Sequence, residues 1–359
     1  MSGALDLLRP DLRDFAGYAS ARRASVTGSV WLNANESPQV SPADPGQSLN
    51  RYPEPQPAAL RERMSALYRV RAEQLMVTRG SDEGIDLLVR AFCRAGLDAV
   101  LIAPPCFGMY AVCARVQNAP LVEVPLQDRD GAWTLDIQGV LEAVAKKNVR
   151  IVFLCSPANP TGQALPLAQI RLLADALRNR AMLVIDEAYL EYSALESATG
   201  LLDQYPQLVV LRTLSKAHAL AGARIGAVLG DASVIAVLRN LSAPYPVPAP
   251  SAAVALAALS EEGIEESSRR CQQAVAERDE LLPKLARIAG VRCVYASEGN
   301  FLLVRFDDAQ GAFDSLLAAG VVVRDVRAMP QLQDALRISI GTAQENALLL
   351  ATLQKGVAA

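Results

Sequence analysis

The sequence predicts an α/β fold: a large domain with a mostly parallel sheet covered by helices, then a smaller α+β domain. The chain has 359 residues, 51% of them hydrophobic, whereas a single core stops growing near roughly 250–300 residues. After about residue 70, short apolar runs alternate with amphipathic stretches, which indicates helical crossovers between parallel strands. Proline becomes frequent at Ala243–Pro250, where we expect the domain junction.

The expected strands of the large domain are short apolar runs, and the expected helices repeat apolar residues at helical spacing. The strands are Met76–Thr78, Ala99–Ala103, Leu121–Val124, Arg150–Leu154, Met182–Asp186, Leu208–Leu211 and Ile225–Leu229. The helices are Asp82–Ala95, Gly108–Val116, Leu135–Lys146 and Leu167–Arg178. In the first helix Ile85, Leu88 and Phe92 share one face, which would cover the sheet.

The smaller domain is expected to begin with a long polar-faced helical region, Glu261–Ile288. Its expected strands are Val291–Ala296, Phe301–Phe306, Val321–Val323 and Leu336–Ile340. We therefore divide the chain into a large domain of residues 31–245 and a small domain of residues 246–359. Residues 1–30 are weakly patterned, and we expect them to lie on the small domain or on a partner subunit.

Composition excludes several classes of protein. With 35 Lys and Arg against 38 Asp and Glu, the chain has no general attraction for nucleic acid. The longest apolar stretch, Val247–Leu259, is interrupted by Pro248 and Pro250 and is too short for a membrane span, which needs roughly 18–20 residues. The charged N-terminus lacks the apolar core of a secretory signal. We therefore expect a cytoplasmic protein without membrane or nucleic-acid partners.

Cysteine and histidine usage argues against a metal centre. The six cysteines form no Cys-x-x-Cys pair, as is typical of reduced cysteines in a cytosolic protein. The single histidine, His218, excludes a zinc cluster built from histidines and argues against a Ser-His-Asp hydrolase. We therefore expect no bound metal.

Three polar side chains occupy or closely follow the ends of expected strands. Asn159 follows one strand in Asn-Pro-Thr-Gly, Asp186 ends the next, and Lys216 lies on a turn between two apolar runs. Ligands of open α/β sheets bind at the carboxyl ends of strands. Burial lowers the pKa of a lysine, and its neutral amine can form a Schiff base with an aldehyde. We therefore expect an amide, a carboxylate and an amine in one site.

This set of groups is what pyridoxal 5'-phosphate (PLP) requires, because that cofactor needs a lysine for its aldehyde and an acid for its ring nitrogen. Asp186 would keep the ring nitrogen protonated, and Asn159 and Tyr189 would bind the ring phenolate oxygen. Anion-binding groups are expected at a helix start and beside the lysine. They are Gly80, Ser81, Asp82, Ser215 and Arg224, with Tyr110 stacking on the ring face. Each motif alone is explained by a turn, a helix cap or a solvated pair, whereas their order along the chain favours the cofactor.

Eight segments carry a resemblance to a known family. They are Trp31–Glu36, Arg51–Glu54, Gly80–Glu83, Phe107–Tyr110, Ser156–Gly162, Asp186–Tyr189, the stretch around Lys216, and Leu336–Gly341. Over nearly its whole length the chain resembles fold-type I PLP-dependent transferases of the aspartate aminotransferase superfamily, and within it the histidinol-phosphate aminotransferase family most. Asn-Pro-Thr-Gly and the lysine region are shared by the superfamily, whereas Asn-Glu and Arg-Tyr-Pro-Glu are more specific to this branch.

The resemblance implies roles for residues at matching positions. Lys216 would bind the cofactor and act as general base, with Asp186 and Tyr189 also in the catalytic set, and Asn159 would help to hold the ring. Tyr52 would reach the phosphate of the neighbouring subunit's cofactor, which implies a homodimer with shared sites. The phosphate would be surrounded by Ser81, Asp82, Thr213, Ser215 and Arg224. The substrate would be bound by Tyr18, Asn33, Asn35, Arg324 and Arg337, with Tyr18 from either subunit.

The implied reaction converts histidinol phosphate and 2-oxoglutarate to imidazole acetol phosphate and glutamate, in histidine biosynthesis. Two departures from the family pattern bear on substrate choice: Phe107 stands where tyrosine is frequent, and His218 replaces a more usual aromatic residue. The alternatives are a decarboxylase of threonine phosphate, an aminotransferase for aromatic or other amino acids, and a regulatory module that binds PLP without turnover. An NAD dehydrogenase would need a Gly-x-Gly-x-x-Gly turn after a strand, which the sequence lacks.

Overall fold

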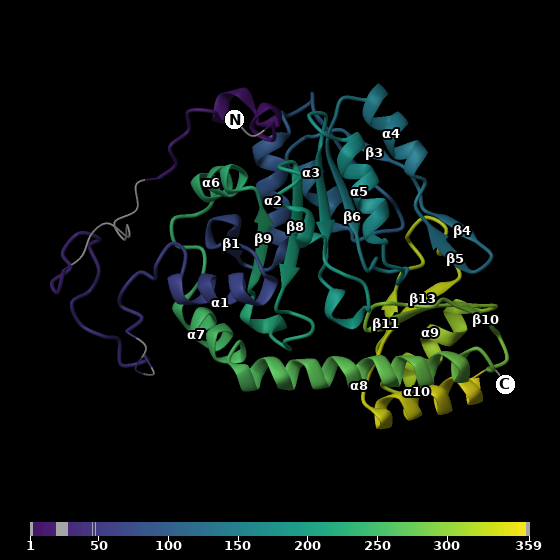
Figure 1. Ribbon diagram of the computed structural model, residues 1–359. Helices are drawn as coiled ribbons and strands as arrows, with labels where there is room; N and C mark the ends of the chain where they lie inside the picture. Colours follow the sequence, from purple (N-terminus) through teal and green to yellow (C-terminus); the bar gives the residue numbers. More distant parts are fainter. Residues whose placement is uncertain (1–2, 19–27, 45, 47, 357–359) are drawn as a thin grey trace.

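The computed structural model describes residues 3–18, 28–44, 46 and 48–356. A seven-stranded sheet forms the centre of the large domain, in the order β1-β9-β8-β7-β6-β2-β3 (Figure 1). The strands are β1 Leu75–Thr78, β2 Ala99–Ile102, β3 Leu121–Glu123, β6 Val149–Cys155, β7 Met182–Asp186, β8 Leu208–Thr213 and β9 Gly226–Gly230. Only β9 runs antiparallel to its neighbours β1 and β8. The predicted α/β class is confirmed.

Helices cover both faces of this sheet because its strands are apolar on both sides. In β7, Leu183 and Ile185 belong to one buried cluster, whereas Met182 and Val184 belong to the other. The helices that pack on this sheet are α1 Ala58–Tyr68, α2 Ser81–Phe92, α3 Met109–Val116, α4 Ile137–Lys146, α5 Leu167–Ala176, α6 Ala232–Leu241 and α7 Ala249–Ala258. The first cluster includes side chains of α1, α4, α5 and α7, and the second those of α2, α3 and α6.

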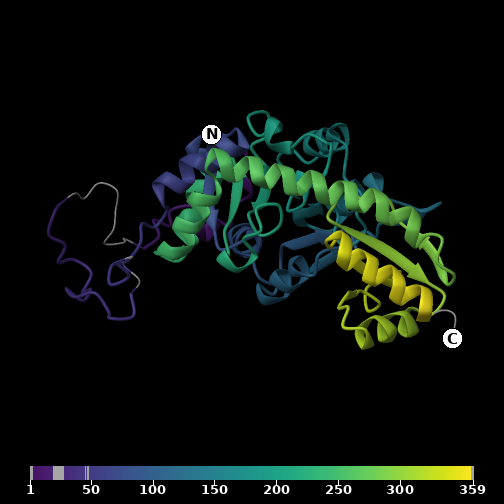
Figure 2. The same cartoon turned by 90° about the horizontal axis from the view of Figure 1, so that it is seen from below.

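The small domain contains an antiparallel sheet in the order β10-β11-β13-β12. Its elements are α8 Glu261–Leu285, β10 Val291–Val294, β11 Phe301–Phe306, α9 Ala309–Ala318, β12 Arg324–Asp325, β13 Ala335–Ser339 and α10 Ala343–Gly356. The long helix α8 extends beneath the large domain and the small one (Figures 1 and 2). A separate hairpin, β4 Gln127–Arg129 and β5 Ala132–Thr134, contacts the small domain through Asp128 and Arg305.

Short 3-10 helices complete the secondary structure of the described residues. They are η1 Leu5–Leu7, η2 Pro10–Leu12, η3 Ala72–Gln74, η4 Leu190–Tyr192, η5 Ala198–Leu201 and η6 Ala221–Ala223. Among the residues that the structure places, no helix combines the length and apolarity that a membrane span would need.

One expected strand differs from the structure. The predicted strand Val321–Val323 is wrong, because the ladder with β13 begins only at Arg324. Val321 and Val323 instead pack against the core of the small domain, while Val322 is 81% exposed, so the alternation of the sequence serves packing. The proline-rich stretch also continues directly into α7, with Pro248 as its N-cap and Pro250 in the first turn, where proline costs no helical hydrogen bond.

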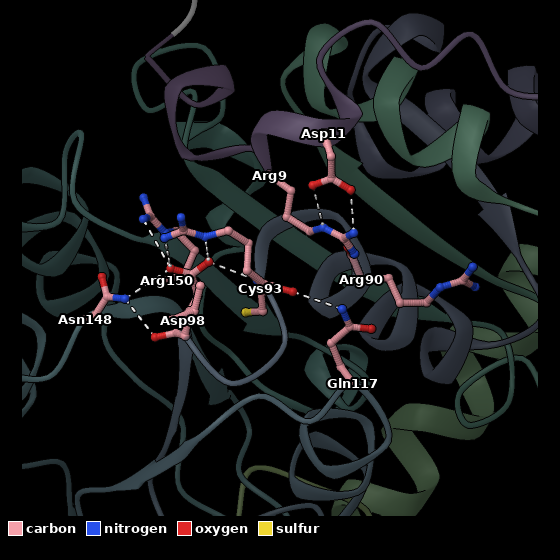
Figure 3. A network of polar contacts seen from close by, with 10 residues as sticks. Arg9, Asp11, Arg90, Cys93, Asp98, Gln117, Asn148 and Arg150 are labelled. Carbon is pink, nitrogen blue, oxygen red and sulfur yellow. Dashed lines mark hydrogen bonds and ion pairs between the residues drawn. The ribbon is translucent and has the colours of Figure 1, made fainter.

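The N-terminal residues 3–12 pack on the large domain. Leu7 and Leu8 are buried in the same cluster as Phe92 of α2, and the Arg9 side chain donates to the Arg90 carbonyl at 2.9 Å (Figure 3). We expected residues 1–30 on the small domain or a partner, and residues 19–27 of that segment lie outside the described ranges. The described part of residues 28–57, here called the strap, has no helix or strand and extends away from the large domain (Figures 1 and 2).

Candidate active site

The carboxyl ends of the parallel strands β6, β7 and β8 meet at one edge of the sheet and open into a cavity of about 150 Å³. Asp186 ends β7 and Thr213 ends β8, while Asn159 and Lys216 lie on the loops that follow β6 and β8. The cavity is lined by Gly80, Ser81, Asp82, Phe107, Cys155, Asn159, Asp186, Ala188, Tyr189, Thr213, Ser215, Lys216, Ala221 and Arg224. The strand-end residues singled out in the sequence are therefore brought together.

Lys216 supplies a free amine in this cavity. Its Nζ lies 5.6 Å from the centre of the Tyr189 ring, and no hydrogen bond or ion pair links it to any other described residue. Desolvation in the cavity lowers the pKa of Lys216, and the nearby Arg337 guanidinium lowers it further. A lysine with a lowered pKa is a better nucleophile near neutral pH, since more of it is the neutral amine.

Asp186 is a buried carboxyl at the floor of the cavity. Burial raises the pKa of Asp186 to about 6, although hydrogen bonds from the Tyr110 hydroxyl and the Ala188 N–H act in the opposite direction. The two donors lie 2.8 Å from Oδ2 and 3.2 Å from Oδ1, respectively. A cationic group placed opposite would keep this carboxyl ionised, as a protonated pyridine nitrogen would.

The anion-binding part of the cavity is built around the start of α2, whose first backbone N–H groups have no intrahelical acceptor. Gly80 adopts φ 79°, and a Cβ there would lie only 2.6 Å from Arg224 Nη2, so glycine allows the guanidinium to approach the helix start. Arg224 donates to Asp82 Oδ2 at 2.8 Å and to Ser215 Oγ at 3.4 Å. Together with Thr213, these groups form a cradle suited to a phosphate.

A second cation reaches the cavity from the small domain. Arg337 on β13 donates to Asn159 Oδ1 at 2.5 Å, and Asn159 Nδ2 donates to the Tyr189 hydroxyl at 3.4 Å. The Nε of Arg337 is buried and has no hydrogen-bond partner among the described residues. Arg324 is the cross-strand neighbour of Arg337. Arg337 thus lies beside the cavity, with Arg324 next to it on β12, and a guanidinium can bind a carboxylate or a phosphate.

Tyr110 does not occupy the position we expected. It lies beneath the cavity, fully buried, with its ring parallel to that of Phe153 at 4.9 Å. Because α3 begins only at Met109, Tyr110 falls in its first turn and faces the sheet. Phe107, which precedes the helix, lines the cavity and contacts the Tyr110 ring edge-on at 5.7 Å. Phe107, and not Tyr110, therefore lines the cavity from this segment.

Four other expected residues lie away from this chain's own cavity. Tyr52 is half-exposed and stacks on Tyr245, with ring centres 4.5 Å apart. Tyr18 is exposed and lines a separate hollow beside α6. Asn33 and Asn35 lie on the strap, and both are exposed. None of the four lines the cavity that contains Lys216.

Sequence reasoning missed a buried ion pair beside the site. Arg212 of β8 donates to Glu187 Oε2 at 2.9 Å and to Glu191 Oε1 at 2.7 Å, and the side chain of Glu187 is only 2% exposed. Glu187 directly follows Asp186, so this pair fixes the chain immediately after the cavity carboxylate. The signal was available, because a glutamate and an arginine in adjacent apolar strands would need each other as partners.

Comparison with known proteins bears on what this cavity does. Residues 20–353 match the family model described as aminotransferase class I and II. The chain belongs to this family. Within the ranges that the structure describes, no group of three or more His, Cys, Asp or Glu side chains is arranged to hold a metal ion.

This aminotransferase has near relatives of full length. It is 56% identical over 354 residues to a protein of Xanthomonas euvesicatoria named histidinol-phosphate aminotransferase, covering 99% of this chain and 98% of the relative. A protein of the same name from Stenotrophomonas maltophilia is 56% identical, covering 97% and 96% of the two chains. The crystal structure of histidinol-phosphate aminotransferase from Sinorhizobium meliloti, in complex with PLP, superposes with a TM-score of 0.77 at 26% identity, over 86% of this chain and 83% of that one. The resemblance noted in the sequence is thus confirmed.

Proposed function

We propose that this protein transfers the amino group of histidinol phosphate to 2-oxoglutarate, with PLP as its cofactor, in histidine biosynthesis. The observation that carries the proposal is the pairing of the free Lys216 amine with the buried carboxyl of Asp186 in one cavity. Relatives with this activity in their names support the choice of substrate, because they match almost the whole chain at 56% identity.

The residues present fit the cofactor. When bound, PLP supplies an aldehyde that condenses with amines and a pyridine ring that withdraws electrons from the substrate. Lys216 would bind the aldehyde, Asp186 would face the ring nitrogen, and Phe107 would stack on the ring. Asn159 and Tyr189, which already share a hydrogen bond, would hold the phenolate oxygen. The phosphate would be bound by the start of α2 together with Ser81, Asp82, Thr213, Ser215 and Arg224.

Lys216 would also move the proton during the reaction. Its amine would act as the base at the donor's Cα, and its lowered pKa leaves more of the amine in the neutral form that accepts a proton. Arg337 and Arg324 would bind the anionic end of the donor and so hold its Cα in place. Glutamate and histidinol phosphate both carry an anionic tail, so one arginine pair could serve both half-reactions.

The shape of the chain supports a homodimer with shared sites. The strap exposes Val30 and Leu32, which are 75% and 89% accessible, and such side chains are stabilised by burial against another chain. In the dimer Tyr52 would reach the phosphate cradle of the partner, and Tyr18, Asn33 and Asn35 would approach the substrate. We keep residues 31–245 and 246–359 as the two domains, and we propose a cytoplasmic location.

One experiment tests the reaction and its main alternative together. Histidinol phosphate should bleach the visible absorption of the purified yellow protein, and 2-oxoglutarate should restore it. Lys216→Ala should abolish turnover, and borohydride should no longer fix the cofactor covalently to the protein. Lys146→Ala, a change on the exposed face of α4, is the control and should alter neither result. Release of carbon dioxide from threonine phosphate without an oxo acid would instead identify a decarboxylase. An L-threonine-O-3-phosphate decarboxylase structure from Porphyromonas gingivalis is 21% identical with a TM-score of 0.72, a likeness that shows only the fold.

A further inference from the structure

Tyr110 connects two groups that face the cofactor position, although it does not itself line the cavity. Its hydroxyl donates to Asp186 Oδ2 at 2.8 Å. Its ring lies between Phe153, which is parallel at 4.9 Å, and Phe107, which is perpendicular at 5.7 Å. One fully buried side chain therefore touches both the carboxyl expected to face the ring nitrogen and the aromatic ring expected to stack on the cofactor.

The direction of the hydrogen bond follows from the chemistry of its two groups. Burial and the nearby negative charge of Asp186 raise the pKa of Tyr110 well above its usual value, so the phenol keeps its proton. A neutral phenol beside a carboxylate can only donate. The bond therefore stabilises the ionised form of Asp186 against the desolvation that favours the protonated form. The Ala188 N–H binds the other oxygen at 3.2 Å, so the plane of the carboxylate is fixed at both atoms.

We propose that Tyr110 is a positioning residue that acts through Asp186: its hydroxyl keeps that carboxylate ionised and aimed at the ring nitrogen of the cofactor, while its ring supports Phe107. This inference rests on the role proposed above for Asp186. An ionised Asp186 leaves the proton on the ring nitrogen, and the electron-withdrawing power of the ring depends on that proton. Without the hydroxyl, Asp186 would compete with the nitrogen for the proton.

The test begins with Tyr110→Phe, which removes the hydroxyl and keeps both ring contacts. Loss of one charge-assisted hydrogen bond should change the ionisation equilibrium of Asp186 about tenfold. The titration midpoint of Asp186 should rise by about one pH unit. Carbon-13 NMR of the full-length protein, labelled at its aspartate carboxyls, measures this midpoint, and the spectrum of Asp186→Asn identifies the Asp186 resonance. In the cofactor-loaded enzyme, kcat should fall about tenfold while KM for histidinol phosphate changes less than about twofold.

Two matched variants separate positioning from packing. Tyr68→Phe removes another buried hydroxyl, one without a hydrogen-bond partner among the described residues, and should leave the Asp186 titration and kcat unchanged. Adding Tyr110→Phe to Asp186→Asn should cause no further loss in kcat, because the partner that Tyr110 acts through is already altered.

The outcomes decide between the alternatives. The proposal is overturned if Tyr110→Phe titrates and turns over like the parent, or if its loss in kcat adds fully to that of Asp186→Asn. Parental activity of Asp186→Asn would instead remove the assumed role of Asp186, and the proposal with it, while the NMR midpoint still reports on the hydrogen bond. Should Tyr110→Phe fail to fold, the parent chain grown with 3-fluorotyrosine replaces it: its more acidic phenol donates more strongly and should lower the Asp186 midpoint, and an unchanged midpoint refutes the proposal.

Discussion

Asp98→Asn should destabilise the protein at neutral pH by an amount that the geometry around the carboxylate sets. The side chain is 2% exposed and accepts hydrogen bonds from Arg94 at 2.6 and 2.8 Å. Asn148 donates to it at 3.1 Å and Arg150 at 3.4 Å (Figure 3). Burial alone would raise the pKa of Asp98, but these partners outweigh it and lower the pKa from 3.8 to about 2. The difference corresponds to about 2 kcal/mol at neutral pH, an upper value because Arg94 is 40% exposed and water screens the pair.

The stabilisation by Asp98 depends on pH in a definite direction. The folded pKa lies below the unfolded one, so the stabilisation is fully present above about pH 4 and disappears as the pH falls toward 2. Urea unfolding of the parent and Asp98→Asn should therefore differ most at pH 7, with a gap that narrows below pH 4. Asp11→Asn, which loses an exposed pair with Arg9, is the control and should match the parent closely. A gap that stays constant down to pH 3 would refute this account of Asp98.

Two substitutions and one pH profile test the cavity and its surroundings. Gly80→Ala should weaken cofactor binding at least about tenfold in a fluorescence titration, because the new Cβ would meet the Arg224 guanidinium and the backbone there has a φ of 79°. The control is Gly222→Ala, where no atom lies within 4 Å of the new Cβ, and it should bind the cofactor like the parent. Arg212→Met should cost about 3–5 kcal/mol in urea unfolding, because it leaves Glu187 buried without its cation, and a loss below 1 kcal/mol would contradict this. Cofactor attachment to Lys216 should reach half its maximal rate below pH 10.5, since the amine pKa is lowered, and stopped-flow absorbance against pH would expose an ordinary lysine by a midpoint at or above that value.

The central site was predictable because a parallel sheet collects its strand ends at one edge. Asn159, Asp186 and Lys216 lie near the ends of β6, β7 and β8, and alternation of strands and helices was enough to place them together. Arg337 was assigned only through the family resemblance. Its hydrogen bond to Asn159 spans 178 positions and two domains, and no local pattern encodes such a contact.

The predictions that differ from the structure concern residues whose position depends on where a helix or a strand begins. Tyr110 and Phe107 are three positions apart, and which one faces the cavity depends on where α3 begins. An aromatic pair at a helix start does not reveal that boundary. The same holds for Val321–Val323, whose alternation suits a strand and equally suits an edge segment that packs without a ladder. Tyr52, Asn33 and Asn35 on the strap lie away from this chain's own cavity, so the roles expected for them depend on the proposed dimer.

The separation of Lys216 and Arg337 onto different domains has a consequence for evolution of substrate choice. The amine that we propose performs the chemistry lies beside the large sheet, whereas the guanidinium that we propose binds the anionic tail lies on β13 of the small one. The distance between them is set by how the two bodies are seated along α8 and by the cluster of Tyr189, Cys271 and Phe301 at their junction. Substitutions in that remote joint could retune which tail length is accepted while every reacting group stays unchanged.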